Sequence, residues 1–206
     1  MKAMKVKLTF TEEVLGTAPT DKELYSTYVA GKAPDAKSMT EEIEAKGEEE
    51  VVEKNRTEFS KDSNGELILW DYQIRGFLKE SIGALKQVKD KACAKCTAHK
   101  KIVDLHVFVE PRQIPIENIE DIRDCQRPLR ASTPQGERTA IAVSDAVSSG
   151  AYIVFTIKYD DIAKVDLRPC IIEALKYGKR HGIGQWRNSG KGTFDYEILE
   201  EFETDE

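Results

Sequence analysis

The chain has 206 residues, which suits one domain with an embellishment, and charged residues make up 33% of it. No apolar run is long enough to span a bilayer, and the first residues lack the features of a signal peptide, so we expect a cytoplasmic protein with no membrane partner. Four cysteines in a chain of this size do not make a disulfide framework.

The net charge of −6 is unevenly distributed. Residues 12–66 hold 15 acidic and 7 basic side chains, whereas residues 67–192 hold 21 basic and 15 acidic ones. Residues 193–206 add 7 acidic side chains and no basic one. A basic middle favours a phosphate-rich ligand, and the two acidic stretches are also consistent with ordinary solvated surface.

The first half of the sequence predicts one strand, an insertion, a second strand and a helix. Residues 5–10 alternate polar and apolar side chains, which is typical of a half-buried strand. Residues 12–66 form an acidic, helix-leaning insertion with few large apolar residues. After the Asn64-Gly65 turn we expect a strand over 66–70 and an amphipathic helix over 72–88.

The second half predicts four more strands and a second helix. The strands are expected at 102–109, 139–143, 151–157 and 193–199, and the helix at 167–179. Residues 123–138 are interpreted as a polar, basic loop, and 200–206 as an acidic tail. This order predicts a single domain over 1–206 of the α+β class, a ferredoxin-like antiparallel sheet with two helices on one face plus an acidic helical insertion.

The strongest local motif is a glycine-rich segment, residues 182–192. Its four glycines permit close backbone approach, and successive N–H groups in such a loop can bind an anion. Arg187 and Lys191 add charge, and Trp186 has the ring that stacks on a base. The motif is neither a Walker loop nor a Rossmann fingerprint, and the structural alternative is a helix-to-strand turn with Trp186 in the core.

Three further patterns in the sequence contain candidate phosphate-binding, metal-binding or catalytic residues. The segment from Arg127 to Arg138 offers three arginines for phosphate contacts, with a solvated surface loop as the alternative. A zinc site would use Cys93, Cys96, His99 and His106, but the usual second ligand pair is absent, so we expect ordinary thiols and no metal or other cofactor. His181 is the one histidine beside the glycine-rich segment and the candidate general base of a nuclease, the hypothesis that the scattered histidines favour least.

The ending of the chain, a helix followed by Gly182-Ile183-Gly184 and then Gly190-Lys191-Gly192, resembles the RAMP superfamily of CRISPR-associated proteins, which have ferredoxin-like or RRM-like folds. Residues 73–79 are similar to the family's helix-opening motif, without its usual serine, and the acidic insertion is not a family hallmark. Residues 127–138 and 184–192 also resemble conserved proteins of phages and prophages of Gram-positive bacteria.

The resemblance implies a protein that binds RNA or single-stranded DNA and assembles with itself or with protein partners in a bacterial cell. The lack of a clear catalytic set of residues favours a protein that is not an enzyme, with a RAMP-type nuclease left open. The alternative is a phage counter-defence protein that binds a nucleotide signal or a host effector. The candidate phosphate-contacting residues, from the resemblance and the patterns together, are Arg75, Lys79, Arg127, Arg130, Arg138, Lys179, Arg180, Gly182, Gly184, Trp186, Arg187, Gly190, Lys191 and Gly192.

Overall fold

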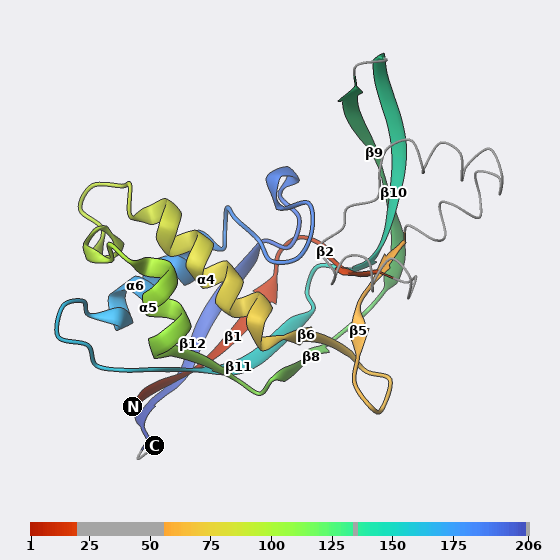
Figure 1. Ribbon diagram of the computed structural model, residues 1–206. Coiled ribbons are helices and arrows are strands. Elements are labelled where there is room, and N and C mark those ends of the chain that lie inside the picture. The colour runs from red at the N-terminus through yellow and green to blue at the C-terminus, as the bar shows by residue number, and fades with distance from the viewer. Residues whose placement is uncertain (20–55, 134–135, 205–206) are drawn as a thin grey trace. The chain divides into compact units, whose positions relative to one another are not determined.

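The computed structural model describes residues 1–19, 56–133 and 136–204 (Figure 1). Most of the predicted acidic helical insertion therefore lies outside the described residues. The chain divides into two compact units. One comprises Met1–Val14, Lys61–Asp121 and Val147–Glu206, and the other comprises Leu15–Ser60 and Ile122–Ala146.

The first unit is built on an antiparallel sheet. Its strands are β1 (Lys2–Phe10), β6 (Leu67–Trp70), β7 (Val107–Glu110), β8 (Gln113–Glu117), β11 (Tyr152–Tyr159) and β12 (Phe194–Glu203). Their order is β12-β1-β11-β8-β6, and β7 also pairs with β11. β1 lies between β12 and β11 and is antiparallel to both, with Val6 opposite Ile198 on one side and Phe155 on the other. The acidic residues 200–203 thus belong to strand β12.

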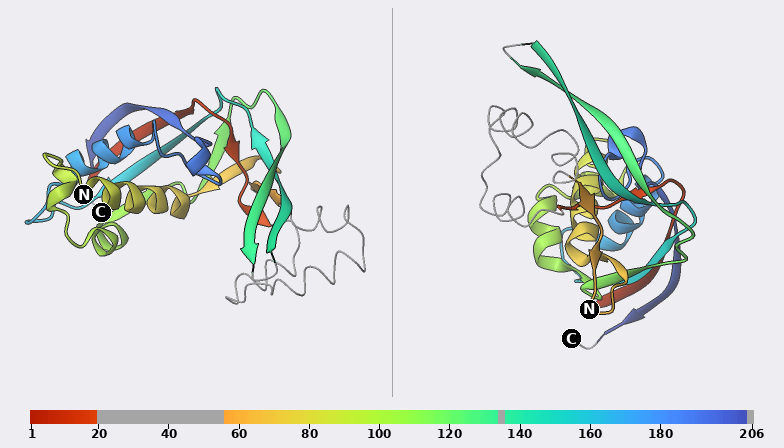
Figure 2. Two further views of the ribbon diagram at one scale, coloured as in Figure 1. Left: turned by 90° about the horizontal axis from the view of Figure 1, so that it is seen from above. Right: turned by 90° about the vertical axis from the view of Figure 1, so that its right-hand side faces the viewer.

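Among the described residues, three α-helices accompany this sheet: α4 (Asp71–Leu85), α5 (His99–His106) and α6 (Leu167–Tyr177). Figures 1 and 2 show α4 and α6 against the same face of the sheet, and the two helices pack on each other. With β7 and β8 taken together as the second strand, and with β6 and α5 as additions on either side of α4, the chain runs strand, helix, strand, strand, helix, strand. The predicted α+β, ferredoxin-like class is confirmed.

The sequence pattern accounts for these elements. β1 buries alternate residues such as Val6, Leu8 and Phe10 and leaves Lys5 exposed. The buried residues of α4 recur every three or four positions and so form one apolar face. α6 begins at a capping aspartate, because the Asp166 side chain accepts a hydrogen bond of 3.1 Å from the backbone N–H of Arg168. None of the described helices is both long enough and apolar enough to cross a membrane.

The strand predicted over 102–109 is wrong in its first half. Residues up to His106 form α5, and only Val107–Glu110 are strand. The run from Ile102 to Val109 is short and rich in β-branched residues, so its periodicity fits a strand. In the structure Val103 is the one fully buried residue of α5, a helix that packs against α4.

The second unit contains a long β-hairpin. Strands β9 (Ile122–Thr133) and β10 (Gly136–Val147) pair along it, as Figure 2 shows, and β10 runs parallel to the short strand β4 (Thr57–Glu58). β4 in turn pairs with β3 (Ala18–Pro19). Two more short strands, β2 (Val14–Leu15) and β5 (Ser60–Lys61), span the division between the units. The prediction of a basic loop over 123–138 is wrong, because backbone pairing makes most of that segment a hairpin.

Candidate nucleic-acid interface

The glycine-rich segment connects α6 to β12 in the first unit. Its two ends, residues 182–183 and Gly192, contact each other through their backbones, and we call this close approach the neck of the loop. The N–H of Ile183 donates to the carbonyl of Gly192 over 2.9 Å. A Cβ atom at Gly192 would lie 1.9 Å from the Ile183 carbonyl oxygen, and one at Gly182 would lie 2.3 Å from the Gly192 carbonyl carbon. Two backbone segments can approach this closely only where no Cβ atom lies between them, so the neck requires glycine at positions 182 and 192.

Trp186 lies beyond the neck, where it is presented to solvent. It has left-handed backbone geometry, with φ of 55°, and is 37% exposed. A short 3₁₀ turn, η2 (Arg187–Ser189), follows it directly. Residues 184–188 together line a hollow of about 360 Å³. The ring is therefore half-exposed at the tip of the loop, which excludes the alternative that Trp186 belongs to the core.

Arg187 and His181 converge on Glu80 of α4. Arg187 forms an ion pair with Glu80, and His181 Nε2 lies 3.2 Å from the same carboxylate and 3.3 Å from Arg187 Nη1. The His181 ring stacks between Phe77 and Tyr177, at centroid distances of 6.5 and 5.6 Å. Burial raises the pKa of Glu80, but hydrogen bonds from Arg187 and His181 outweigh it and lower that pKa below its usual value.

Lys191 ties the neck of the loop to the segment after β1. Its ammonium group lies 2.9 Å from the Glu13 carboxylate and 3.9 Å from that of Glu12. The N–H of Gly192 also donates to the Glu13 carbonyl oxygen over 2.7 Å. The loop therefore has a second anchor, and Lys191 is the charged part of it.

The remaining candidate cations of the first unit are mostly paired as well. Arg75 contacts Asp71 one helical turn earlier at 3.2 Å, and Lys79 pairs with Asp104 of α5. Lys179 lies 2.6 Å from Asp195, and this hydrogen bond raises the lysine pKa. Arg180 is exposed and forms no ion pair within the described part of the chain. Sequence reasoning found these cations but missed their carboxylate partners, two of which, Asp104 and Asp195, lie on other elements.

The arginine segment lies on the hairpin of the second unit. Arg127 of β9 is buried, with 6% exposure, its Nη2 donates to Ser144 over 3.4 Å, and burial lowers its pKa. Arg130 and Arg138 lie on the two strands toward the turn of the hairpin. The hairpin brings these two strands together, but Arg127 is too deeply buried to meet a phosphate without rearrangement.

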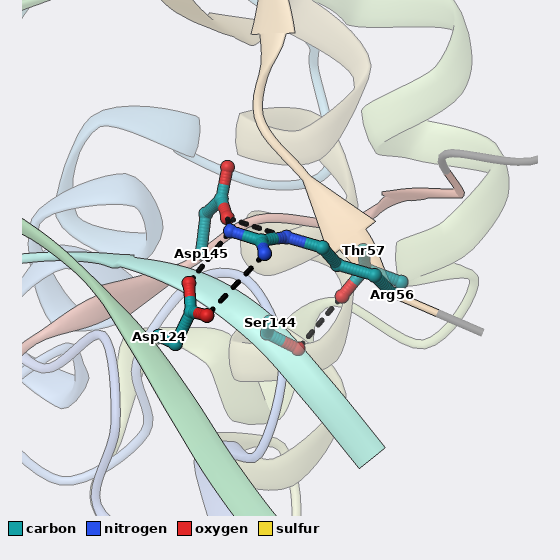
Figure 3. A network of polar contacts seen from close by, with 5 residues as sticks. All are labelled: Arg56, Thr57, Asp124, Ser144 and Asp145. Atoms are coloured by element: carbon teal, nitrogen blue, oxygen red, sulfur yellow. Dashed lines mark hydrogen bonds and ion pairs between the residues drawn. The ribbon is translucent and has the colours of Figure 1, made fainter. Parts of the chain in front are cut away.

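A separate arginine fixes the other end of the hairpin, as Figure 3 shows. Arg56 bonds Asp124 of β9 and Asp145 of β10, in each case at 2.6 Å, and Thr57 bonds Ser144 at 2.7 Å. The hydrogen bond to Asp145 raises the pKa of Arg56 despite partial burial. This network clamps the two strands, and nothing in the local sequence marked Arg56 for this role.

The cysteines are packing residues in this structure. Cys93, Cys96 and Cys170 are all fully buried, and the Cys93 thiol donates to the Cys170 carbonyl oxygen over 3.6 Å. Hydrogen bonding to Cys170 and burial raise the pKa of Cys93. His106 contacts Asp160 at 3.0 Å. Over the described ranges, no three His, Cys, Asp or Glu side chains are placed to hold a metal ion.

No protein-family model matches the chain, and no curated protein matches it. Among solved structures, the chain is similar to one in the cryo-EM structure of a type III-B Cmr-beta bound to cognate target RNA, with a TM-score of 0.52 at 10% sequence identity. This likeness concerns the fold. The match covers 98% of this chain and 60% of that one, so this chain spans about three fifths of its neighbour's length. Within this ferredoxin-like fold, the glycine-rich loop joins the second helix of the arrangement, α6, to its last strand, β12.

Proposed function

We propose that the chain binds single-stranded nucleic acid, with RNA as the preferred ligand. The binding surface is formed by the glycine-rich loop and the adjoining side of α4. The observation that carries this proposal is Trp186, held half-exposed at the loop tip directly before Arg187. An aromatic ring beside a guanidinium group is the combination that stacks on a base and neutralises its phosphate. The fold likeness to a protein of an RNA-bound complex supports RNA as the ligand.

The ion pairs of the loop fit a binding surface that is closed in the unliganded chain. Arg187 and Lys191 are held by carboxylates, and Arg187 is exposed enough to exchange its partner, with 30% of its side-chain surface accessible. A phosphate oxygen is geometrically similar to a carboxylate oxygen for a guanidinium donor. RNA would therefore replace Glu80 as the partner of Arg187, at the cost of breaking the pair.

The test is fluorescence polarisation with labelled single-stranded RNA, single-stranded DNA and duplex DNA across a salt series. We expect salt-sensitive binding to single strands. Arg187→Gln should weaken it by roughly tenfold, which corresponds to about 1.4 kcal/mol. Lys164→Gln is the matched control, because this exposed lysine lies before the first residue of α6, whereas the loop follows the last residue of that helix. Unchanged affinity in Arg187→Gln and in Lys191→Gln would refute the role of the loop.

A second function is proposed on the size of the hollow at the loop tip. Its volume of about 360 Å³ falls in the range of small-molecule sites, which supports the alternative of a phage-encoded counter-defence protein that captures a nucleotide signal. Saturable binding of a mononucleotide or cyclic nucleotide, without binding of oligonucleotides, would establish this function in place of the first. Assembly with itself or with protein partners is proposed for both and is tested by light scattering with and without ligand.

A further inference from the structure

A second aromatic cluster lies in the first unit, at the junction between β6 and α4. Trp70 is the last residue of β6 and Tyr72 is the second residue of α4. Their rings stack with centroids 6.2 Å apart and planes inclined by 14°. The Arg112 guanidinium lies 6.0 Å from the centroid of the Trp70 ring. None of the motifs singled out in the sequence includes these three residues.

The backbone on both sides holds the cluster in place. The N–H of Trp70 donates to the Gln73 side chain over 2.7 Å, and the N–H of Asp71 donates to the carbonyl of Arg112 over 3.0 Å. Trp70 also lies opposite Gln113 in the pairing of β6 with β8. The three side chains thus project from backbone that is fixed by hydrogen bonds, so a ligand would not need to order it.

The exposure of the cluster distinguishes it from core packing. Tyr72 is 57% exposed, more than any other large hydrophobic residue in the described part of the chain. Because Arg112 lies over the Trp70 ring, the strongly exposed Tyr72 ring is the one that presents a face to solvent, and every nucleobase has a flat face to match. The near-parallel rings therefore form a ready platform for a further flat group.

The charge beside the platform favours a nucleotide over an uncharged group. Asp71 is already paired with Arg75 at 3.2 Å. Arg112 is exposed, and within the described residues no carboxylate pairs with it, in contrast to Arg187 and Lys191 of the loop. A guanidinium next to stacked aromatic rings is placed to meet the phosphate that flanks a stacked base.

We propose that Trp70, Tyr72 and Arg112 form a stacking subsite for one unpaired nucleobase of a single strand, with Arg112 on the adjacent phosphate. The inference rests on the proposed function for the class of its ligand. It adds a second contact point, on a different element from the glycine-rich loop.

The two tryptophans of the chain make the two sites separable by fluorescence. In Trp186→Phe, Trp70 is the sole tryptophan, and in Trp70→Phe it is Trp186. Titration of Trp186→Phe with a single-stranded oligouridylate should quench the Trp70 emission saturably. Adding Tyr72→Ala should weaken binding roughly fivefold or more, whereas Tyr72→Phe, which keeps the ring, should not. Arg112→Gln should lower the salt dependence by about one phosphate contact.

The outcomes separate this inference from the proposed function. Quenching of Trp186 alone leaves the proposed function standing and overturns the subsite. Quenching of Trp70 alone supports the subsite and refutes the loop, and no quenching in either variant refutes both. Equal affinities for the Tyr72→Ala and Tyr72→Phe proteins, with circular dichroism showing both folded, would also overturn the subsite.

Discussion

Glu80 and Arg187 are 107 residues apart in sequence and form an ion pair that ties α4 to the glycine-rich loop. Glu80 directly follows residues 73–79, so the pair holds the loop beside that segment of α4. Arg187, the cation that we propose for phosphate binding, is therefore already paired with a carboxylate in the unliganded chain. The strength of nucleic-acid binding should therefore depend on Glu80 as well as on Arg187.

Removing the charge of Glu80 should strengthen binding. In Glu80→Gln, Arg187 no longer has to leave a carboxylate, and one repulsive charge near the bound phosphate is lost. We expect the affinity for single-stranded RNA at low salt to rise severalfold, measured by fluorescence polarisation. Glu120→Gln removes the same charge from an exposed position without an ion pair in the described structure, and should have a smaller effect. Weaker binding in Glu80→Gln would show instead that the carboxylate orients Arg187 for its ligand.

The same carboxylate gives stability a defined dependence on pH. The folded-state pKa of Glu80 lies below its usual value of 4.5, so the unfolded chain takes up this proton first as the pH falls. The ionised Glu80 side chain therefore adds to the free energy of unfolding. This contribution is fully present above pH 4.5 and is lost as the pH falls through the folded-state pKa. Because Glu80 is half-exposed, the contribution should be only a few tenths of a kcal/mol, about the size of a surface pair.

Urea unfolding of the native protein and of Glu80→Gln, at pH 7 and in acid, measures this contribution. The difference in unfolding free energy should be present at pH 7 and vanish in acid. A difference that persists unchanged at a pH well below the folded pKa would assign it to packing and not to charge.

The neck of the loop should be intolerant of any side chain. Gly192 has φ of 69°, and its Cβ would clash with the Ile183 carbonyl oxygen at 1.9 Å, so Gly192→Ala should destabilise the protein by about 2 kcal/mol or more. Gly76 is the matched control, because it lies inside α4 and an added Cβ meets no atom within 4 Å. Gly76→Ala should stabilise by about 0.5–1 kcal/mol. Thermal unfolding measures both, and equal effects would contradict the geometry of the neck.

The clamp at Arg56 should control local opening of the hairpin in the second unit. Arg56→Gln leaves Asp124 and Asp145 facing each other without their cation, so amide hydrogen exchange should speed up in β9 and β10 around these residues. Adding Asp145→Asn removes the repulsion and should restore part of the protection. If the double variant exchanges as fast as the single one, the aspartates are not in repulsion.

The elements of the fold could be predicted where one periodicity dominated. The alternation in residues 5–10 and the spacing of Ile74, Leu78 and Ile82 gave the right element type, and together with element order they predicted the ferredoxin-like arrangement. The helix over His99–His106 could not be recognised, because its short apolar run fits either period. The strand predicted over 139–143 lies within β10, but β9 and its pairing with β10 were missed, because proline and glycine argued for a loop and cross-strand pairing is not visible in a local pattern.

The backbone geometry of the candidate site could be predicted from the sequence, but the ion-pair partners of its charged side chains could not. The glycines at 182 and 192 indicated a close backbone approach, which the neck shows. Side-chain partners from other elements, such as Glu80 for Arg187 or Glu13 for Lys191, depend on the tertiary fold. The same is true of Arg112, which reaches the Trp70 ring only through the pairing of β6 with β8.

The packing of His181 between two aromatic rings has a spectroscopic consequence. Its ring planes are inclined by only 22° to Phe77 and 28° to Tyr177, so ring currents from both neighbours should displace the proton resonances of the imidazole. The chain has three histidines, and the other two stack on no aromatic ring in the described structure. One resolved pair of imidazole signals should thus report, in solution, whether the loop is seated against α4.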